Sequence, residues 1–294
     1  SEDIWQFFYR GAYFRRGPVA MAAFGAVDMA LWDLAGKAAG KPVYELLGGP
    51  VKPDIPVYAS ALHPVGAEKV QAEAKAYVEE GYQAMKMRFP YGPGHGIAGM
   101  RANEEHVANV RDAVGDDIEI MADAYMGWDF LYAKKMVKRL EPYRLAWLEE
   151  AFLPDDLNSY AKLRQETSIP ISGGEHEYTR FGFQQIIEKQ AMDIIQPDLR
   201  RCGGLSEGRR ICSLALANGI TVIPHAYGPT HIHFALAETA VPMIEYFPIP
   251  CWDDLPDAEV EPIFHDEPQP QNGRVTASTK PGLGVTVNER IFAD

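Results

Sequence analysis

From residue 55 onward the sequence alternates between short apolar runs and amphipathic stretches, and this alternation limits the possible folds more than any other feature. A strand-like run at 55–60, for example, is followed by a helical pattern at 68–80. Strands that alternate with helices at this pitch form parallel sheets with right-handed crossovers. Eight such runs favour a closed (β/α)8-type barrel, similar to a TIM barrel, over an open doubly wound sheet. The eight runs are residues 55–60, 84–89, 118–122, 145–148, 169–172, 194–196, 220–223 and 243–246.

Two flanking regions depart from this alternation. Residues 19–37 form one apolar helical pattern, which a Gly-Lys-Pro break at 40–42 ends. After residue 248 the sequence is rich in Pro and Asp, so we expect extended segments outside the barrel. The sequence therefore predicts three regions, which are a helical segment at 1–53, the barrel at 54–247 and a C-terminal extension at 248–294 that packs back on it.

The charge and cysteine content exclude several classes of partner. The 294 residues include 28 Lys and Arg against 41 Asp and Glu, so the formal net charge is −13. Because such a chain repels phosphate, we expect it to bind neither nucleic acid nor anionic membranes. We also expect no secretion signal and no spanning helix, since no run approaches about 18 apolar residues. Three scattered cysteines without a CxxC pair favour a reducing compartment, hence the cytoplasm, over disulfides or a zinc site.

Polar side chains stand at the predicted carboxyl ends of strands 2 to 8. In a barrel of this type the active site lies at that end. Core packing would not place a polar or charged residue at so many successive strand ends. We therefore expect the functional site there, built from Lys86, Arg88, Asp123, Glu149, Glu175, Asp198, His225 and Glu245.

Three of these residues, Asp123, Glu149 and Glu175, are carboxylates spaced 26 residues apart. At one barrel mouth their charges would raise one another's pKa values. A hard divalent cation removes that repulsion, and an all-oxygen ligand set suits Mg²⁺. The alternative, that each acid only caps the following helix, does not account for three at matching strand ends. Glu150 competes with Glu149, but equal spacing favours Glu149 and leaves Glu150 beside the ligands or in solvent.

His225 follows the apolar run 221–224, where a lone histidine is more often structural. Asp198, at the neighbouring strand end, is close enough in a barrel to accept a hydrogen bond from one ring nitrogen. That bond would fix the tautomer and raise the basicity of the imidazole. A His–Asp pair facing a Mg²⁺ site fits abstraction of a proton next to a metal-bound carboxylate.

These residues resemble the enolase superfamily, in its mandelate-racemase-like branch. The resemblance covers essentially the whole chain. It implies a modified (β/α)7β barrel, with residues 1–53 as the helical end of a capping domain whose N-terminal part precedes Ser1. It also implies a homo-oligomer. The matching stretches are residues 121–125, 147–150, 174–175, 196–198 and 224–225, with 22–34 similar to the segment before that family's barrel.

The resemblance also implies roles for individual residues. Mg²⁺ would be the cofactor, held by the three spaced carboxylates, and His225 with Asp198 would be the catalytic base pair. Glu245 would hydrogen-bond near the substrate carboxylate or the departing oxygen. His176 directly follows Glu175 and is either a second acid or a neutral histidine packed outside the barrel mouth.

The second strand departs from the family pattern. It reads Lys86-Met87-Arg88, where the family commonly has two lysines. Arg remains protonated near neutral pH, so it is a poor base but a good carboxylate clamp. We therefore expect Lys86, Arg88 and His176 to bind substrate. Racemisation, which needs two opposed bases, is disfavoured, and loss of a β-hydroxyl with one base fits better.

Within the family, residues 123–128, 173–177, 193–198 and 202–204 look most like acid-sugar dehydratases, in particular the L-rhamnonate dehydratase group. This implies a hydro-lyase that converts an aldonate such as L-rhamnonate to its 2-keto-3-deoxy acid, through C2 proton abstraction and an enediolate. The alternatives are a racemase or cycloisomerase of the same superfamily, or a catalytically inactive sugar-acid-binding homologue.

Two further patterns are interpreted without a functional role. Residues 94–99 spell GxGxxG, but they follow Phe89 in a long connection, so we expect a mobile loop rather than a dinucleotide-binding turn. His231 and His233 are two residues apart and would diverge on a helix, which does not suit a metal pair.

Overall fold

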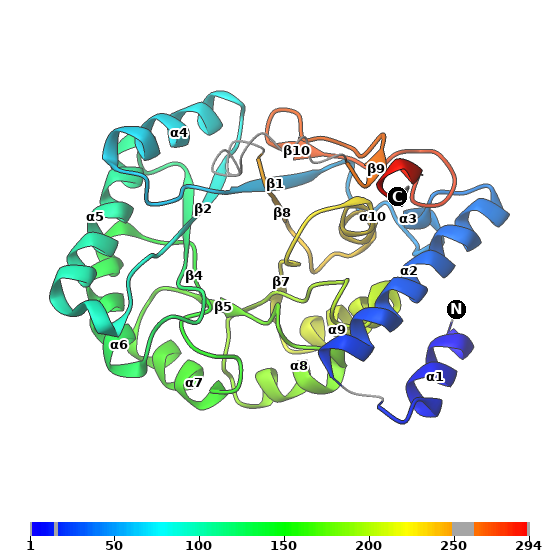
Figure 1. Ribbon diagram of the computed structural model, residues 1–294, viewed down its shortest axis with the longest axis horizontal. Coiled ribbons are helices and arrows are strands. Elements are labelled where there is room, and N and C mark those ends of the chain that lie inside the picture. The colour runs from blue at the N-terminus through cyan, green and yellow to red at the C-terminus, as the bar shows by residue number, and fades with distance from the viewer. Residues whose placement is uncertain (1, 15–16, 249–261, 293–294) are drawn as a thin grey trace.

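The computed structural model of the protein describes residues 2–14, 17–248 and 262–292. At its centre is a curled parallel sheet with helices around the outside (Figure 1). The first seven strands pair in chain order and the eighth pairs with the first, which is the order of a closed barrel. The predicted barrel-type α/β fold is thus confirmed. Its strands are β1 (Ile55–Ser60), β2 (Ala84–Arg88), β3 (Glu119–Asp123), β4 (Leu148–Glu149), β5 (Ile171–Gly173), β6 (Ile194–Ile195), β7 (Thr221–Val222) and β8 (Ile244–Tyr246).

Seven α-helices alternate with these strands within residues 55–246. In α6, for example, the side chain of Asp129 caps the first turn by accepting the Tyr132 N–H at 2.8 Å. Apolar residues at helical spacing then face the sheet. The seven are α4 (Ala67–Glu79), α5 (Gly96–Val114), α6 (Phe130–Leu140), α7 (Leu157–Glu166), α8 (Thr179–Glu188), α9 (Gly204–Ala217) and α10 (Pro229–Ala237), with 3-10 turns η1 (Pro93–His95) and η2 (Glu141–Tyr143).

The glycine-rich segment 94–99 is not the mobile loop that the sequence predicted. It forms the 3-10 turn η1 and the first turn of α5, which begins at Gly96. Gly96, with φ of 54°, joins the two elements in a conformation that favours glycine. Gly99 then packs directly on the side chains of Tyr91 and His95.

Three helices precede the barrel, α1 (Glu2–Gly11), α2 (Pro18–Ala39) and α3 (Val43–Leu46). The pattern at 19–37 correctly predicted α2, which has Pro18 in its first turn and ends at Gly40 in the left-handed conformation. By length and composition α2 could cross a membrane. It lies against α9, however, as α3 lies against α10 (Figure 1).

The C-terminal residues 262–292 consist of short strands joined by turns. Strand β10 (Arg274–Val275) pairs antiparallel with the start of β1, so this part of the chain contacts the barrel. Strands β9 (Phe264–His265) and β11 (Thr286–Val287) pair with each other, and η4 (Glu289–Phe292) follows. The Pro- and Asp-rich residues 249–261, with Cys251, lie outside the described residues.

Candidate active site

The carboxyl ends of the strands bring the predicted residues together above an apolar floor. Strand pairing sets Arg88 beside Asp123, and Asp123 beside Glu149. Below them a separate buried cluster fills the barrel interior, so the charged groups can face only one another and the mouth. This cluster consists of Tyr58, Ala84, Met121, Trp147 and Ile223.

Asp123 is a buried carboxylate with little compensating charge. Its Oδ1 accepts the backbone N–H of Tyr125 at 2.7 Å, while Arg88 reaches only to 4.0 Å from Oδ2. Burial, and then the charge of Glu149, raise the pKa of Asp123 to about 7. The site therefore holds more negative charge than its own cations neutralise.

Glu149 is held by three donors. Trp147 Nε1 and Gln196 Nε2 donate to its Oε2 at 2.8 and 2.7 Å, and Lys86 donates to its Oε1. Lys86 also pairs with Glu245 Oε1 at 2.9 Å. Although burial opposes it, these two carboxylates raise the pKa of Lys86 well above its usual range. Lys86 was expected to bind substrate, but it lies fully buried between two acids and offsets only part of their charge.

Glu150 is buried rather than in solvent. Its Oε1 lies 2.9 Å from Nδ1 of His176, and its Oε2 is a buried oxygen without a hydrogen-bond partner in the structure. Glu150, Glu175 and His176 offer ligand atoms that all lie within 4.8 Å of one another. This group shares only Glu175 with the predicted metal ligands. The backbone of Glu150 has φ of 42°, which accompanies the turn of its side chain toward His176.

His225 and Asp198 form the predicted pair. Nδ1 of His225 lies 3.0 Å from Oδ2 of Asp198, and Nε2 lies 3.2 Å from Oε2 of Glu175. Against the effect of burial, hydrogen bonding to His225 and nearby cations lower the pKa of Asp198. An ionised Asp198 assigns the proton of His225 to Nδ1 and leaves Nε2 facing the carboxylates.

The same carboxylates act on the basicity of His225. Burial lowers the pKa of His225, but the bond to Asp198 and the charges of Glu245 and Glu175 outweigh it, and the pKa is raised. Glu245 itself accepts the Ala226 N–H at 2.7 Å. Despite complete burial, Lys86 and His225 lower the pKa of Glu245 to about 2, so it is an anion.

Arg201 is a site residue that sequence analysis missed. Its Nη1 donates to Oε1 of Glu175 at 3.2 Å, and its Nε lies 3.6 Å from Oδ2 of Asp198. It follows β6 in the turn before α9, beyond the strand end where the search was made. A basic residue three positions after Asp198 was the only available signal.

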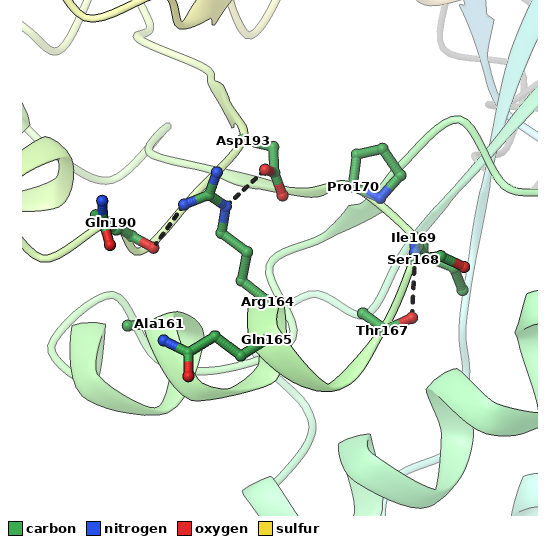
Figure 2. A pocket seen from close by; sticks show the side chains of 9 residues that line it. All are labelled: Ala161, Arg164, Gln165, Thr167, Ser168, Ile169, Pro170, Gln190 and Asp193. Atoms are coloured by element: carbon green, nitrogen blue, oxygen red, sulfur yellow. Dashed lines mark hydrogen bonds and ion pairs between the residues drawn. The ribbon is translucent and has the colours of Figure 1, made fainter.

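A cavity of about 300 Å³ lies at the opposite, amino-terminal side of β5 and β6 (Figure 2). There Arg164 reaches from α7 to Asp193, and Nε donates to Oδ1 at 2.6 Å. Asp193 Oδ2 in turn accepts the Ile171 N–H at 2.9 Å. These charges already satisfy one another and brace two strands, so this cavity offers no groups for chemistry.

The strand-end carboxylates fit a hard divalent cation. Asp123, Glu149 and Glu175 supply only oxygen donors, as Mg²⁺ prefers. The raised pKa values of Asp123 and Glu175, which burial dominates, indicate charge that a cation would stabilise. The buried, unpartnered oxygen of Glu150 is a further acceptor beside them.

Known protein families match the chain on both sides of the α3–β1 connection. Residues 69–291 match the family described as enolase C-terminal domain-like, and residues 1–48 match the mandelate racemase / muconate lactonizing enzyme N-terminal domain. The chain belongs to the enolase superfamily. The resemblance read from its strand-end residues is therefore confirmed.

Relatives of this enolase superfamily member include several named enzymes. An L-rhamnonate dehydratase of Saccharopolyspora erythraea is 37% identical over an alignment of 298 positions, which covers 99% of this chain and 73% of that protein. The solved 3,6-anhydro-D-galactonate cycloisomerase from Zobellia galactanivorans is 32% identical, with a TM-score of 0.86, over 99% of this chain and 80% of that chain. A solved racemase from Streptomyces coelicolor with bound magnesium is 28% identical, with a TM-score of 0.86, over 99% and 76%.

Proposed function

We propose that this protein is a Mg²⁺-dependent hydro-lyase that dehydrates an aldonate, such as L-rhamnonate, to its 2-keto-3-deoxy acid. The observation that carries the proposal is the placement of His225. Asp198 occupies its Nδ1, and its Nε2 faces the strand-end carboxylates at 3.2 Å from Glu175. The relative named as an L-rhamnonate dehydratase supports the same reaction.

His225 would remove the proton from C2 of the substrate. Its raised pKa makes Nε2 a stronger base, and the bond to Asp198 stabilises the imidazolium that results. Arg88 stands at the end of β2, where a second lysine would otherwise serve as base. Because a guanidinium does not give up its proton, Arg88 does not supply a second base opposite His225.

A Mg²⁺ ion held by Asp123, Glu149 and Glu175 would stabilise the negative charge that develops on the substrate carboxylate when the C2 proton leaves.

The same histidine would complete the dehydration. After the C2–H bond breaks, its electron pair forms the enediolate. The electrons of the enediolate then form a double bond between C2 and C3 while the bond between C3 and its hydroxyl breaks. Protonated His225 gives its proton to the departing oxygen, which leaves as water. The remaining enol becomes the 2-keto-3-deoxy acid. Glu245, an anion 3.9 Å from Nε2 of His225, would hydrogen-bond near the substrate carboxylate or the departing oxygen.

Two side chains would contact substrate, and a third, Lys86, would act on it indirectly. Arg88 reaches the mouth, since its side chain is 33% exposed and stacks near Tyr125, so it would clamp a carboxylate. His176 is part-buried against Glu150 and would contact a hydroxyl. Lys86 would act from below, through the charge it places between Glu149 and Glu245.

We further propose a cytoplasmic homo-oligomer that binds neither nucleic acid nor membranes, as the charge, the cysteine content and the family resemblance indicate.

The test is a panel of acid sugars incubated with the protein and Mg²⁺, with mass spectrometry to detect loss of water and a colour reaction for the 2-keto-3-deoxy product. Reactions in D₂O with Mg²⁺ measure deuterium exchange at C2, and reactions with EDTA in place of Mg²⁺ are the control. Dehydration of one aldonate supports the proposal. A product of unchanged mass would identify a racemase or cycloisomerase, and Mg²⁺-dependent binding without deuterium exchange at C2 would identify an inactive binding protein.

A further inference from the structure

Helices α1 and α2 contact the segment that joins β6 to α9, residues 199–206. Nε1 of Trp5 donates to the Gly203 carbonyl at 2.9 Å, and Nε1 of Trp32 donates to Oγ of Ser206 at 3.0 Å. Asp28 in α2 bonds Ser206 twice, since Oδ2 accepts its backbone N–H at 2.8 Å and Oδ1 accepts its hydroxyl at 2.6 Å. Residues far apart in the sequence thus meet at the start of α9.

Asp28 acts as the missing cap of α9. The residue at the N-cap position is Gly203, which has no side chain to bond the free N–H groups of the first turn. Asp28 provides that acceptor from another helix, and the positive end of the α9 dipole favours its negative charge. Asp28 is only 2% exposed, and burial raises its pKa, so this contact is made inside the protein.

The backbones of α2 and of residues 200–206 lie in direct contact. A Cβ added at Gly25 of α2 would meet Gly204 N at 3.1 Å and the Arg200 carbonyl oxygen at 3.2 Å. A Cβ added at Gly204, whose φ is +90°, would lie 2.5 Å from Oδ2 of Asp28. The α2 surface therefore determines where residues 200–206 run.

The same segment holds the base pair. The Asp198 carbonyl accepts the N–H groups of Arg201 and Cys202 at 2.9 and 2.7 Å, which ties the strand end to the turn before α9. From this turn Arg201 bonds Glu175, and Asp198 bonds His225. A shift of the turn would move both contacts.

We propose that Asp28 is a positioning residue: by capping α9 from α2, it holds residues 198–206 so that Asp198 stays aligned with His225 and Arg201 with Glu175. Its effect on rate rests on the function proposed above, whereas its effect on the segment does not. Because Asp28 touches neither substrate nor the reacting atoms, it acts only through that segment.

The first experiment compares Asp28→Ala with Asp33→Ala. Asp33 lies on the same helix and also accepts a backbone N–H, that of Leu283 at 2.8 Å, but in the C-terminal segment. For Asp28→Ala we expect kcat to fall about 10- to 100-fold with little change in KM, as for a small misplacement of a catalytic group. Amides at 199–206 should exchange about tenfold faster, as on loss of a helix cap. Asp33→Ala should change neither.

The conservative variant Asp28→Asn keeps an oxygen that can accept the Ser206 N–H, so we expect it to recover most of the lost kcat. If Asp28→Ala does not fold, Asp28→Asn and Ser206→Ala are compared instead, and the larger loss should follow the faster exchange at 199–206. Unchanged amide exchange at 199–206 in Asp28→Ala overturns the proposal. Faster exchange in that variant with unchanged kcat overturns it as well.

A third measurement separates this inference from the proposed function. The downfield proton resonance of His225 Nδ1–H, assigned by its loss in His225→Asn, reports the bond to Asp198 without any substrate. If no aldonate reacts, the proposed function fails, and this resonance alone decides the role of Asp28. Its loss in Asp28→Ala but not in Asp33→Ala supports positioning, and its retention in both overturns it.

Discussion

His225 and His233 are both largely inside the protein, yet their surroundings shift their pKa values in opposite directions. His225 lies among Asp198, Glu175 and Glu245, which raise its pKa against the effect of burial. His233, on α10, has backbone partners instead. Its Nδ1 accepts the Tyr44 N–H at 3.1 Å and its Nε2 lies 3.2 Å from the Leu283 carbonyl oxygen. Burial lowers the pKa of His233 to about 4.

The difference shows that burial does not decide what a histidine does. Carboxylate partners stabilise an imidazolium, so a buried ring among them can take up and return a proton. Backbone partners on both nitrogens fix the neutral ring, which then joins α10 to α3 and to the C-terminal segment. The first is a group for chemistry and the second a structural group. The following predictions test this contrast and the groups that surround His225.

Replacing His225 should have the largest effect. In His225→Asn we expect C2 deuterium exchange and dehydration to fall by at least about 10²–10⁴-fold, because one residue serves as base and acid. Mg²⁺ affinity, measured by titration calorimetry, should be nearly unchanged, and His233→Asn should retain kcat. Retained C2 exchange would place the base elsewhere, with His176 or Lys86 next, and weakened Mg²⁺ binding would make His225 a ligand.

The next effect concerns which glutamate at the carboxyl end of β4, Glu149 or Glu150, holds the cation. We expect Glu149→Gln to weaken Mg²⁺ binding more than about 100-fold, and Glu150→Gln about tenfold, because outer groups that orient ligands contribute less than the ligands. Both variants remove one charge at adjacent buried positions, so each controls for the other. The reverse order would assign the metal to Glu150, Glu175 and His176, whose ligand atoms all lie within 4.8 Å of one another.

His233 should make the protein sensitive to acid. Its pKa of about 4 in the folded state is below the ordinary value of 6.5, so the unfolded chain binds the proton more readily. Its contribution to stability is present above pH 6.5 and is lost as the pH falls toward about 4. We expect His233 to account for about 2 kcal/mol of the stability lost between pH 7 and pH 5 in urea unfolding. His233→Gln should reduce this slope, and an unchanged slope would contradict the assignment.

The smallest effect is expected from a change at Arg88, which lies opposite His225 in the proposed site. In the His225→Asn background, Arg88→Lys rebuilds a two-lysine strand end but provides no acid for the departing hydroxyl. We expect no recovery of dehydration and C2 exchange at no more than about a hundredth of the wild-type rate. The NMR assay for deuterium at C2 measures both outcomes, and recovered dehydration would show that His225 is not required as the acid.

Much of the fold and the main groups of the site could be predicted because they depend on period and position. Alternating apolar runs predicted the barrel, and the residues at the strand ends predicted that Asp198 lies beside His225. Details that depend on partners from other strands could not be predicted. The burial of Lys86 between Glu149 and Glu245 requires three strands to close around it. Likewise, the glycine pattern at 94–99 does not show that Gly99 packs on Tyr91.

The sequence by itself determined the order of strands and helices, the side of the barrel that carries charge and the types of group gathered there, because these follow from local periodicity and parallel strand order. Only the tertiary structure decided the protonation and partners of those groups. His225 and His233 have the same side chain and similar burial, and distant residues alone separate them. Asp28 meets Ser206 across most of the chain. Such contacts, and the electrostatic fields that they create, exist only once the chain has folded.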